Sequence, residues 1–190
     1  MTTLINLCKA FAGESQARNR YIIYAKRAKK EGLDLNVKLF LETVDQEGTY
    51  ARILFEMIQS IKKEGQETPI IETAVPIDFG TTADNLLAAI AGETYEHDTM
   101  YPEFAAKAAE EGYNQIAAKL RLIGKAEENH HNRYQMMLDE LKQNNLYMKK
   151  EKVFWVCREC GYIFESVQAP KVCPLCGEPG DFFRVQAAMQ

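Results

Sequence analysis

The stretch IAAKLRLIGKAEENHHNRYQMMLDEL, residues 116–141, decides the fold. Its apolar residues recur at alternating steps of four and three, which is typical of one inward face of an α-helix. This face comprises Ile116, Leu120, Ile123, Glu127, His130, Tyr134, Met137 and Leu141. Glu127 and His130 therefore occupy positions where the pattern calls for apolar side chains. We predict a long core helix that turns a carboxylate and an imidazole toward the interior.

Three earlier stretches repeat this design, with Glu14, Glu47 and Glu93 on the apolar face of each. The spacing indicates a duplicated two-helix unit, because Glu14 and Glu47 are 33 residues apart and Glu93 and Glu127 are 34 apart. Glu14 taken alone is better explained as a helix-edge residue, but the set of five with His130 is not. Burying ionised carboxylates is costly, so four that converge require cations between them. We therefore predict a pair of metal ions inside the bundle.

The Glu-x-x-His motif of di-metal bundles is complete in one half of the chain and altered in the other. In carboxylate-bridged di-metal bundles, two helices each give a Glu and two each give Glu-x-x-His, whose members share a helix face. Glu127 and His130 fit this motif, whereas the stretch that begins at Glu47 ends in Tyr50. Glu96, three residues after Glu93, is a further candidate ligand.

The two other histidines have simpler explanations. His131 lies about 100° around the helix from His130, so we expect it at the surface or behind the ligands. His97 could supply an imidazole beside Glu93, but a position on the helix flank explains it better.

The helical pattern predicts four long helices. They are expected at about 2–31, 34–63, 82–112 and 113–145. Short turns join each pair, and a crossover of roughly 18 residues between the pairs favours an antiparallel four-helix bundle. We expect Thr82 to cap the third helix and Pro102 to kink it just after Glu96.

Two cysteine pairs predict a second metal site near the C-terminus. Cys157 and Cys160 are separated by twelve residues from Cys173 and Cys176, and each pair is followed by glycine. Glycine permits the positive-φ turn that lets backbone N–H groups point at the sulfurs, so we predict such a turn after each pair. This spacing is typical of a tetrahedral sulfur site, which suits zinc or a single iron. We do not expect two disulfides, because the N-terminus shows no secretory segment. The fifth cysteine, Cys8, lies on an apolar helix face and is expected to be a buried thiol.

Composition excludes several classes of function. The chain has 190 residues, 46% of them hydrophobic, and a net charge of −4, so no basic field would attract nucleic acid or anionic membrane. The N-terminus runs directly into an amphipathic helix, so we expect no secretory segment and a cytoplasmic protein. We predict a metal-binding bundle over residues 1–147 and a small metal-ribbon domain over residues 152–190.

These motifs together resemble the rubrerythrin family across essentially the whole chain. The residues that carry the resemblance are Glu14, Glu47, the stretches 92–96 and 100–105, Glu127, His130 and the four cysteines. The resemblance implies a ferritin-like di-iron bundle followed by a rubredoxin-like Fe(Cys)4 domain. It also implies a non-haem peroxidase that reduces hydrogen peroxide to water. Electrons would come from rubredoxin or an NAD(P)H-dependent reductase, and the protein would be a homodimer.

The resemblance also implies a set of iron ligands. Glu47 and Glu127 would bridge the irons, Glu14 and Glu96 would bind the first, and Glu93 and His130 the second. Tyr21, Tyr95 and Tyr101 are candidates for hydrogen bonds to these ligands.

The chain departs from the family at Tyr50, where members have a histidine that replaces the Glu96 equivalent on the first iron upon reduction. Glu96 and Tyr50 are the candidate catalytic residues, and three interpretations of Tyr50 are open. The one we favour leaves Tyr50 uncoordinated and hydrogen-bonded to Glu14 or Glu96. The others are a phenolate ligand, and a weak first site that leaves a mixed or single-metal centre.

Two rival functions share these motifs. A ferroxidase or iron-storage protein would use the same bundle to oxidise Fe(II), although storage has no need of an attached electron carrier. A zinc-ribbon regulator or scaffold would bind metal for stability alone. Roughly three irons per chain would favour the peroxidase, whereas two irons and one zinc would favour the rivals.

Overall fold

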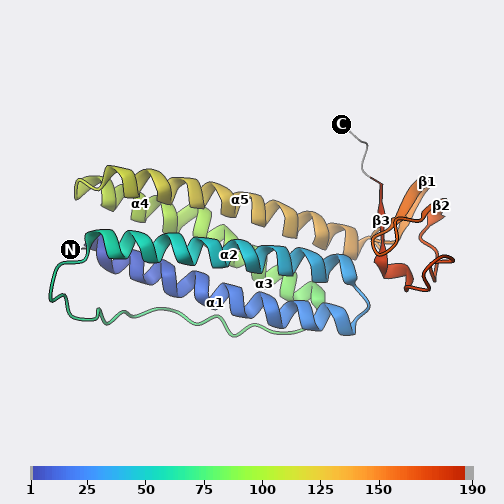
Figure 1. Cartoon of the computed structure of the whole chain (residues 1–190), viewed down its shortest axis with the longest axis horizontal. Helices are drawn as coiled ribbons and strands as arrows, with labels where there is room; N and C mark the ends of the chain where they lie inside the picture. The colour runs from blue at the N-terminus through green and yellow to red at the C-terminus, as the bar shows by residue number, and fades with distance from the viewer. Residues whose placement is uncertain (1, 187–190) are drawn as a thin grey trace.

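The computed structural model describes residues 2–186 as a bundle of long helices with a small sheet at one end (Figure 1). The helices are α1 (Thr2–Lys30), α2 (Asp34–Ile61), α3 (Thr82–Tyr95), the π-helical segment η1 (Glu96–Met100), α4 (Tyr101–Glu110) and α5 (Asn114–Lys142). α3, η1 and α4 run on as one long helix, so the predicted four-helix bundle is confirmed. Residue 1 and residues 187–190, the outer ends of the two predicted domains, lie outside the described residues.

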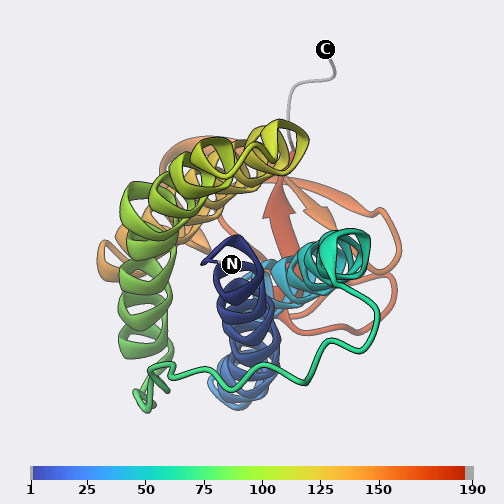
Figure 2. The ribbon, with the colours of Figure 1, turned by 90° about the vertical axis from the view of Figure 1, so that its left-hand side faces the viewer.

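Two apolar clusters fill the interior of the bundle and leave a gap between them (Figure 2 shows the helices end-on). One cluster is built on Tyr21, Tyr24, Phe40, Leu86, Tyr134 and Leu138. The other is built on Leu7, Leu54, Met100, Tyr101 and Leu120. Along each of the four long helices, the predicted glutamate falls between the residues of one cluster and those of the other. The fold therefore places the four glutamates between two apolar clusters.

The two helical hairpins close with the same turn. Gly32 and Gly112 have φ angles of 68° and 85°, a left-handed conformation that glycine adopts without strain. The residue after each glycine donates its backbone N–H to a carbonyl five residues back, at 3.0 and 2.8 Å. This shared turn supports the predicted duplication.

A glutamate before each of these glycines caps the first helix of the other hairpin. Glu31 accepts a hydrogen bond from the backbone N–H of Thr82 at 3.0 Å. Glu111 accepts from Thr2 and Thr3 at 2.9 and 3.0 Å, and these bonds lower its pKa to about 2. The hairpins therefore satisfy each other's free helix-end donors.

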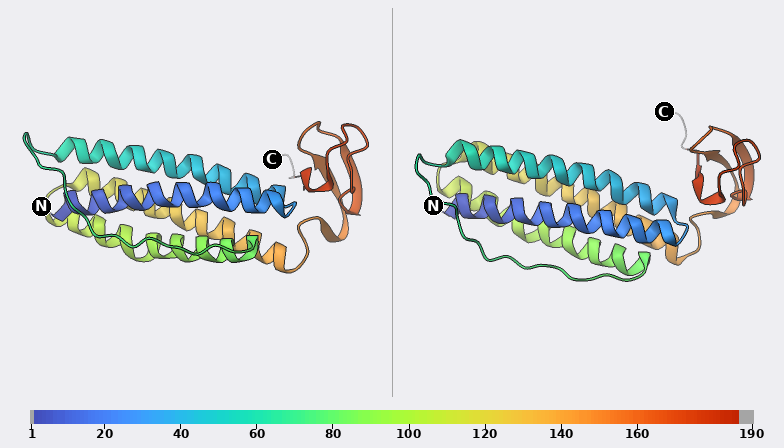
Figure 3. Two further views of the ribbon diagram at one scale, coloured as in Figure 1. Left: turned by 90° about the horizontal axis from the view of Figure 1, so that it is seen from below. Right: turned by 60° about the horizontal axis from the view of Figure 1, so that its bottom comes forward.

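The connection between the hairpins runs the length of the bundle on its outer surface (Figure 3). Residues 62–80 contain a turn at Gly65 and otherwise lie outside helices and strands. The Tyr24 hydroxyl donates to the Asp78 carbonyl at 2.8 Å, which ties the connection to α1. The predicted cap needs correction by one residue. Thr81 is the N-cap of α3, because its side chain accepts from the Asp84 N–H and the Asp84 carboxylate accepts from the Thr81 N–H.

Where a kink was predicted after Glu96, the structure has a π-helical turn over Glu96–Met100. The backbone N–H of Tyr101 donates to the carbonyl of Glu96, five residues back. Proline has no N–H and its ring crowds the carbonyl four residues earlier, which favours a wider turn before it. The additional residue advances the buried face by one position, so Met100 and Tyr101 are both buried. This advance brings Tyr101 toward the gap between the clusters.

The small domain is an antiparallel sheet in the order β2-β1-β3. Its elements are β1 (Met148–Cys157), β2 (Ile163–Gln168), the 3₁₀ turn η2 (Gly180–Phe182) and β3 (Phe183–Val185). Trp155 and Phe183 form its core with Cys157, Ala169 and Cys173. These few buried side chains make a small hydrophobic core. A domain with so small a core needs a cross-link such as a bound metal for its stability.

Arg158 ties the small domain to the bundle. Its guanidinium donates to the carboxylate of Asp34 at the start of α2, and to the carbonyls of Phe182 and Asp181 at 3.1 and 3.2 Å. Its charged carbon also lies 5.6 Å from the centre of the Phe182 ring. Because Arg158 lies within the first cysteine pair, the cysteines sit at the end of the bundle where α2 begins.

Within residues 2–186, every helix is too short or too polar to span a membrane.

Candidate metal centres

Each long helix of the bundle contributes a buried carboxylate to the gap between the apolar clusters. Glu14, Glu47, Glu93 and Glu127 are all fully buried. Ligand atoms of Glu47, Glu93, Glu127 and His130 lie within 4.8 Å of one another. Four of the predicted ligands therefore converge on one small space.

The Nδ1 atom of His130 faces three carboxylates at once. It lies 2.7 Å from Glu127 Oε2, and 3.3 Å from both Glu47 Oε1 and Glu93 Oε2. A ring nitrogen carries at most one proton, and of these contacts the one with Glu93 has hydrogen-bond geometry. A cation among the four groups would satisfy them together.

Glu14 and Glu96 lie beside this group rather than within it. Glu14 is fully buried and Glu96 is 8% exposed. Burial raises the pKa of Glu96 well above its usual range, and the carboxylates of Glu14 and Glu93 raise it further. The two side chains therefore share the electrostatic environment of the four-residue group, and their coordination of a metal stays a prediction.

Two of the three candidate tyrosines hydrogen-bond to the site. The Tyr21 hydroxyl donates to Glu93 Oε1 at 2.5 Å, and the Tyr101 hydroxyl donates to Glu14 Oε1. Tyr95 was the third candidate, but its side chain points outward and is 57% exposed. Tyr21 and Tyr101 fix the orientation of two candidate ligands.

The free oxygens of the site fit metal ions. Both carboxylate oxygens of Glu47 and of Glu127, and Oε2 of Glu14, are buried without a hydrogen-bond partner among the described residues. Burial raises the pKa of all three groups, and for Glu14 and Glu127 neighbouring carboxylates add to the rise. Unpartnered buried oxygens of this kind are costly unless they bind a cation. Carboxylates with an imidazole are a donor set that suits a pair of iron ions.

The raised pKa values predict how the protein responds to pH when its bundle metal is removed. Because Glu14, Glu47, Glu96 and Glu127 bind protons more tightly when folded, stability should fall as pH rises above about 4.3. Burial lowers the pKa of His130, but the carboxylates of Glu47 and Glu93 outweigh this and raise it from 6.5 to about 9. The stabilisation from the charged ring is therefore also lost as pH rises through that range.

Thermal melts between pH 5 and pH 9 test this prediction. We expect the Tm of protein without bundle metal to fall steadily across the range. With metal added, the Tm should be raised most at high pH, because binding requires deprotonated ligands. A Tm that rises with pH in the metal-free protein would contradict the raised pKa values of these groups.

Tyr50 contacts the site through its ring rather than its hydroxyl. The predicted hydrogen bond to Glu14 or Glu96 is not formed among the described residues. The Tyr50 ring instead stacks on His130, with centroids 5.8 Å apart and planes 26° apart. It lines a hollow of about 230 Å³ between α2 and α5, and burial, followed by the nearby carboxylates, raises its pKa. These features favour a neutral phenol outside the ligand set.

The remaining candidates lie outside the four-residue group. His131 Nδ1 lies 2.9 Å from the Thr94 hydroxyl, and its ring meets that of His97 edge-on at 5.5 Å. Both histidines are half-buried on the helix flanks, as expected. Cys8 was predicted to be buried but is half-buried, because it lies at the edge of the apolar face of α1.

Two residues that hold His130 carry no signal in the sequence. Gln46 Oε1 lies 3.0 Å from His130 Nε2 and accepts a hydrogen bond from Arg133 at 2.7 Å. Both residues occupy polar positions beside the apolar faces of α2 and α5. The contact across the two helices identifies them, and helical periodicity does not.

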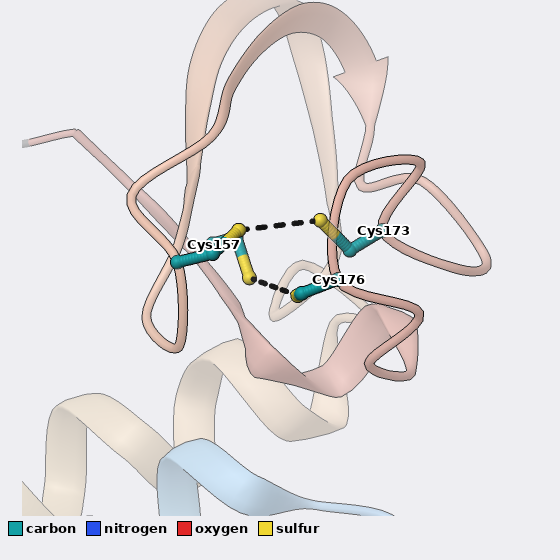
Figure 4. Close-up of side chains that lie close together, drawn as sticks. Cys157, Cys173 and Cys176 are labelled. Atoms are coloured by element: carbon teal, nitrogen blue, oxygen red, sulfur yellow. Dashed lines mark hydrogen bonds between the residues drawn. The ribbon is translucent and has the colours of Figure 1, made fainter.

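The four cysteines of the small domain form a second group. Their sulfur atoms lie within 4.8 Å of one another, and the pairs Cys157–Cys176 and Cys160–Cys173 are 3.7 and 3.6 Å apart. A disulfide requires about 2.0 Å, whereas a metal with bonds of about 2.3 Å to sulfur holds its ligands about 3.8 Å apart. Figure 4 shows the thiols of Cys157, Cys173 and Cys176 turned toward one another. The group therefore fits a tetrahedral metal site and not two disulfides.

The predicted glycine turns shape this site. Gly161 and Gly177 have φ angles of 76° and 82°, and their N–H groups donate to the carbonyls of Cys157 and Cys173 at 2.9 Å. Burial raises the pKa of Cys173, but backbone N–H groups and neighbouring thiols outweigh it and lower the value to about 7. A backbone N–H lowers the pKa of Cys176, but burial and the other three thiols raise it to about 12. A bound cation is needed before all four thiols ionise together.

Known proteins match both sites. The family model described as Rubrerythrin matches residues 6–138, and that described as Rubrerythrin, rubredoxin-like domain, matches residues 155–184. A "Putative rubrerythrin" from Methanocaldococcus jannaschii is 42% identical, over 97% of this chain and 92% of its own length. "Rubrerythrin-1" from Clostridium acetobutylicum is 43% identical, over 96% of this chain and 93% of its own length. A structure of fully reduced, all-ferrous nigerythrin aligns with a TM-score of 0.65 at 30% identity, covering 97% of this chain and 86% of the other.

Proposed function

Because the chain belongs to the rubrerythrin family, we propose that it is a non-haem di-iron peroxidase that reduces hydrogen peroxide to water. Membership makes it an iron-dependent oxidoreductase of oxidative-stress defence. Its two donor groups fit a di-iron centre in the bundle and a rubredoxin-like iron site in the small domain. In our proposal, the cysteine-bound iron relays electrons to the bundle.

The presence of both donor groups in one chain is the observation that carries this proposal. The reduction of one peroxide to two waters consumes two electrons and two protons, so the catalyst must be reloaded with electrons after each turnover. A tetrathiolate iron is a one-electron carrier suited to that task. A ferroxidase that stores iron would gain nothing from such a carrier, which is why we place that function second.

The residues of the bundle divide into ligands and the groups that hold them. We propose that Glu47 and Glu127 would be shared by the two irons, that Glu14 and Glu96 would hold the first, and that Glu93 and His130 would hold the second. When bound, the irons would supply the electrons that break the peroxide O–O bond. Tyr101 and Tyr21 hold Glu14 and Glu93 in place through their hydroxyls.

Glu96 is the candidate ligand that the substrate would meet first. A hollow of about 280 Å³ lies between α1, the α3–η1 segment and the crossover, and Glu96 forms part of its wall. Lys9, Arg20 and Glu72 line the same hollow, so its wall carries charges of both signs. Peroxide is small enough to enter, and the raised pKa of Glu96 suits a carboxyl group that passes protons to the departing oxygen.

The position of the cysteine site supports a dimer. Arg158 places it beside Asp34, and the 13 residues from Asp34 to Glu47 span about 20 Å of helix. Electron transfer slows steeply with distance, so we propose a homodimer in which the small domain of one protomer serves the bundle of its partner. Rubredoxin or an NAD(P)H-dependent reductase in the cytoplasm would supply the electrons. We retain the division into a bundle of residues 1–147 and a small domain of residues 152–190.

Metal content and the visible spectrum of anaerobically purified protein test the proposal. We expect roughly three irons per chain and a rubredoxin-like band that bleaches on reduction and returns when peroxide is added. A colourless protein with zinc at the cysteines would favour the regulator or the ferroxidase. A rubredoxin-like band that does not change when peroxide is added would show that the cysteine-bound iron is not coupled to the bundle irons.

Replacing Tyr50 with phenylalanine should leave two irons in the bundle and peroxidase activity within about twofold. The stacked phenol lies outside the carboxylates, and phenylalanine preserves the ring contact with His130. A phenolate on ferric iron would give a visible charge-transfer band. Loss of such a band, or of one iron, in Tyr50→Phe would show that tyrosine is a ligand after all.

A further inference from the structure

A hydrogen-bonded chain reaches from the surface of the bundle to His130. The Arg133 guanidinium donates to Glu42 Oε1 at 2.7 Å, to the Thr43 hydroxyl at 3.3 Å and to Gln46 Oε1 at 2.7 Å. The same Gln46 oxygen lies 3.0 Å from Nε2 of His130. The opposite ring nitrogen, Nδ1, is the atom that faces the carboxylates.

The chemistry of Arg133 sets the direction of this chain. A guanidinium stays charged and offers only donors, so the oxygen of the Gln46 amide must face it. That oxygen is an acceptor, and Nε2 of His130 must therefore supply the proton of their shared bond. A neutral imidazole that is protonated on Nε2 carries its lone pair on Nδ1.

We propose that Gln46, held by Arg133, is a positioning residue that keeps His130 protonated on Nε2 and so presents Nδ1 to the bundle metal. The inference rests on the metal site of the proposed function but not on its peroxide chemistry. A partner behind a ligating histidine usually changes metal affinity 10–100-fold. Gln46 would be that partner of His130 here. Arg133 would turn the oxygen of the Gln46 amide, rather than its NH2 group, toward the ring.

Tyr50 adds a second restraint on the same ring. Gln46 and Tyr50 lie one turn apart on α2, so this helix holds both an edge and a face of the imidazole. Stacking resists tilting of the ring, and the hydrogen bond resists a flip that would exchange Nδ1 and Nε2. The two contacts together restrain the orientation of the ring.

The nitrogen-15 NMR spectrum of the imidazoles in zinc-loaded, full-length protein tests the proposal directly. Zinc(II) is diamagnetic, and the chain has three histidines, so the His130 signals are readily assigned. We expect a metal-bound Nδ1 and a protonated Nε2 in the parent and in Gln46→Glu, which keeps an acceptor oxygen. In Gln46→Leu and Arg133→Met, a mixture of tautomers or loss of the bound signals is expected.

Titration with Fe(II) gives a second readout. Binding to the bundle should weaken 10–100-fold in Gln46→Leu and recover in Gln46→Glu. Glu42→Gln is the matched control, because it removes only the charge of an exposed partner of Arg133 and leaves Gln46 in place. Its affinity should equal that of the parent.

The outcomes separate this inference from the proposed function. A parent protein that binds no metal in the bundle overturns both. If Gln46→Leu and Arg133→Met bind through Nδ1 with the affinity of the parent, the inference falls and the proposed function stands. Arg133→Met leaves Gln46 itself intact, so it decides the matter if Gln46→Leu does not fold.

Discussion

Replacing Glu127 with alanine should empty the bundle of both irons and abolish peroxide reduction. Glu127 is fully buried, and its Oε2 lies 2.7 Å from His130 Nδ1, at the centre of the four-residue group. The loss of affinity should exceed the roughly 100-fold that a residue behind the ligands can cause. Iron analysis after anaerobic loading should find about one iron per chain, held by the cysteines.

The metal-free Glu127→Ala protein should fold at least as well as the metal-free parent. Glu127 carries a raised pKa and two unpartnered oxygens, so removing it relieves a cost that metal would otherwise offset. Glu128→Ala is the matched control, since Glu128 is exposed on the next position of α5. Two bundle irons in Glu127→Ala, or their loss in Glu128→Ala, would contradict the assignment.

Replacing Cys173 with serine should remove the cysteine-bound iron and disorder the small domain. Cys173 is buried beside Trp155 and Phe183, and the domain has few other buried side chains. Without its metal, such a small core rarely supplies more than about 3–5 kcal/mol. The visible band should vanish, and the fluorescence of Trp155, the one tryptophan of the chain, should shift toward that of an exposed indole.

The bundle should survive this change with its two irons. Turnover should then fall by at least about tenfold, because electrons no longer reach the bundle through the tetrathiolate. A single oxidation of the pre-reduced bundle by peroxide should remain. Cys8→Ser, which alters a cysteine outside the group, should leave both the band and turnover unchanged. Full turnover in Cys173→Ser would mean that the small domain is not the electron relay.

Much of the fold could be predicted because helices and cysteine turns leave local signatures. Alternating steps of four and three placed Glu127 and His130 on a buried face, and the structure confirms that they converge with Glu47 and Glu93. Gly161 and Gly177, which follow the two cysteine pairs, predicted the turns beside which the four thiols converge. Such features depend on residues a few positions apart, so periodicity and spacing reveal them.

The third helix shows where local rules stop short. Pro102 predicted a kink after Glu96, but the structure has a π-turn there. The added residue of the π-turn carried Tyr101 onto Glu14, a contact between helices that the proline alone does not indicate. The cap of α3, by contrast, is a local feature that the prediction missed by one residue, because Thr81 and Asp84 form a capping box.

The sequence alone therefore determined the class of fold, the carboxylate set and the cysteine site. The tertiary structure determined how His130 is held, where Tyr50 points and where the small domain docks. Gln46, Arg133 and Tyr50 act through contacts between α2 and α5, and Arg158 acts through Asp34, 124 residues away. Helical periodicity reports which face of a helix is buried. It carries no information about which residue on a neighbouring helix that face will meet.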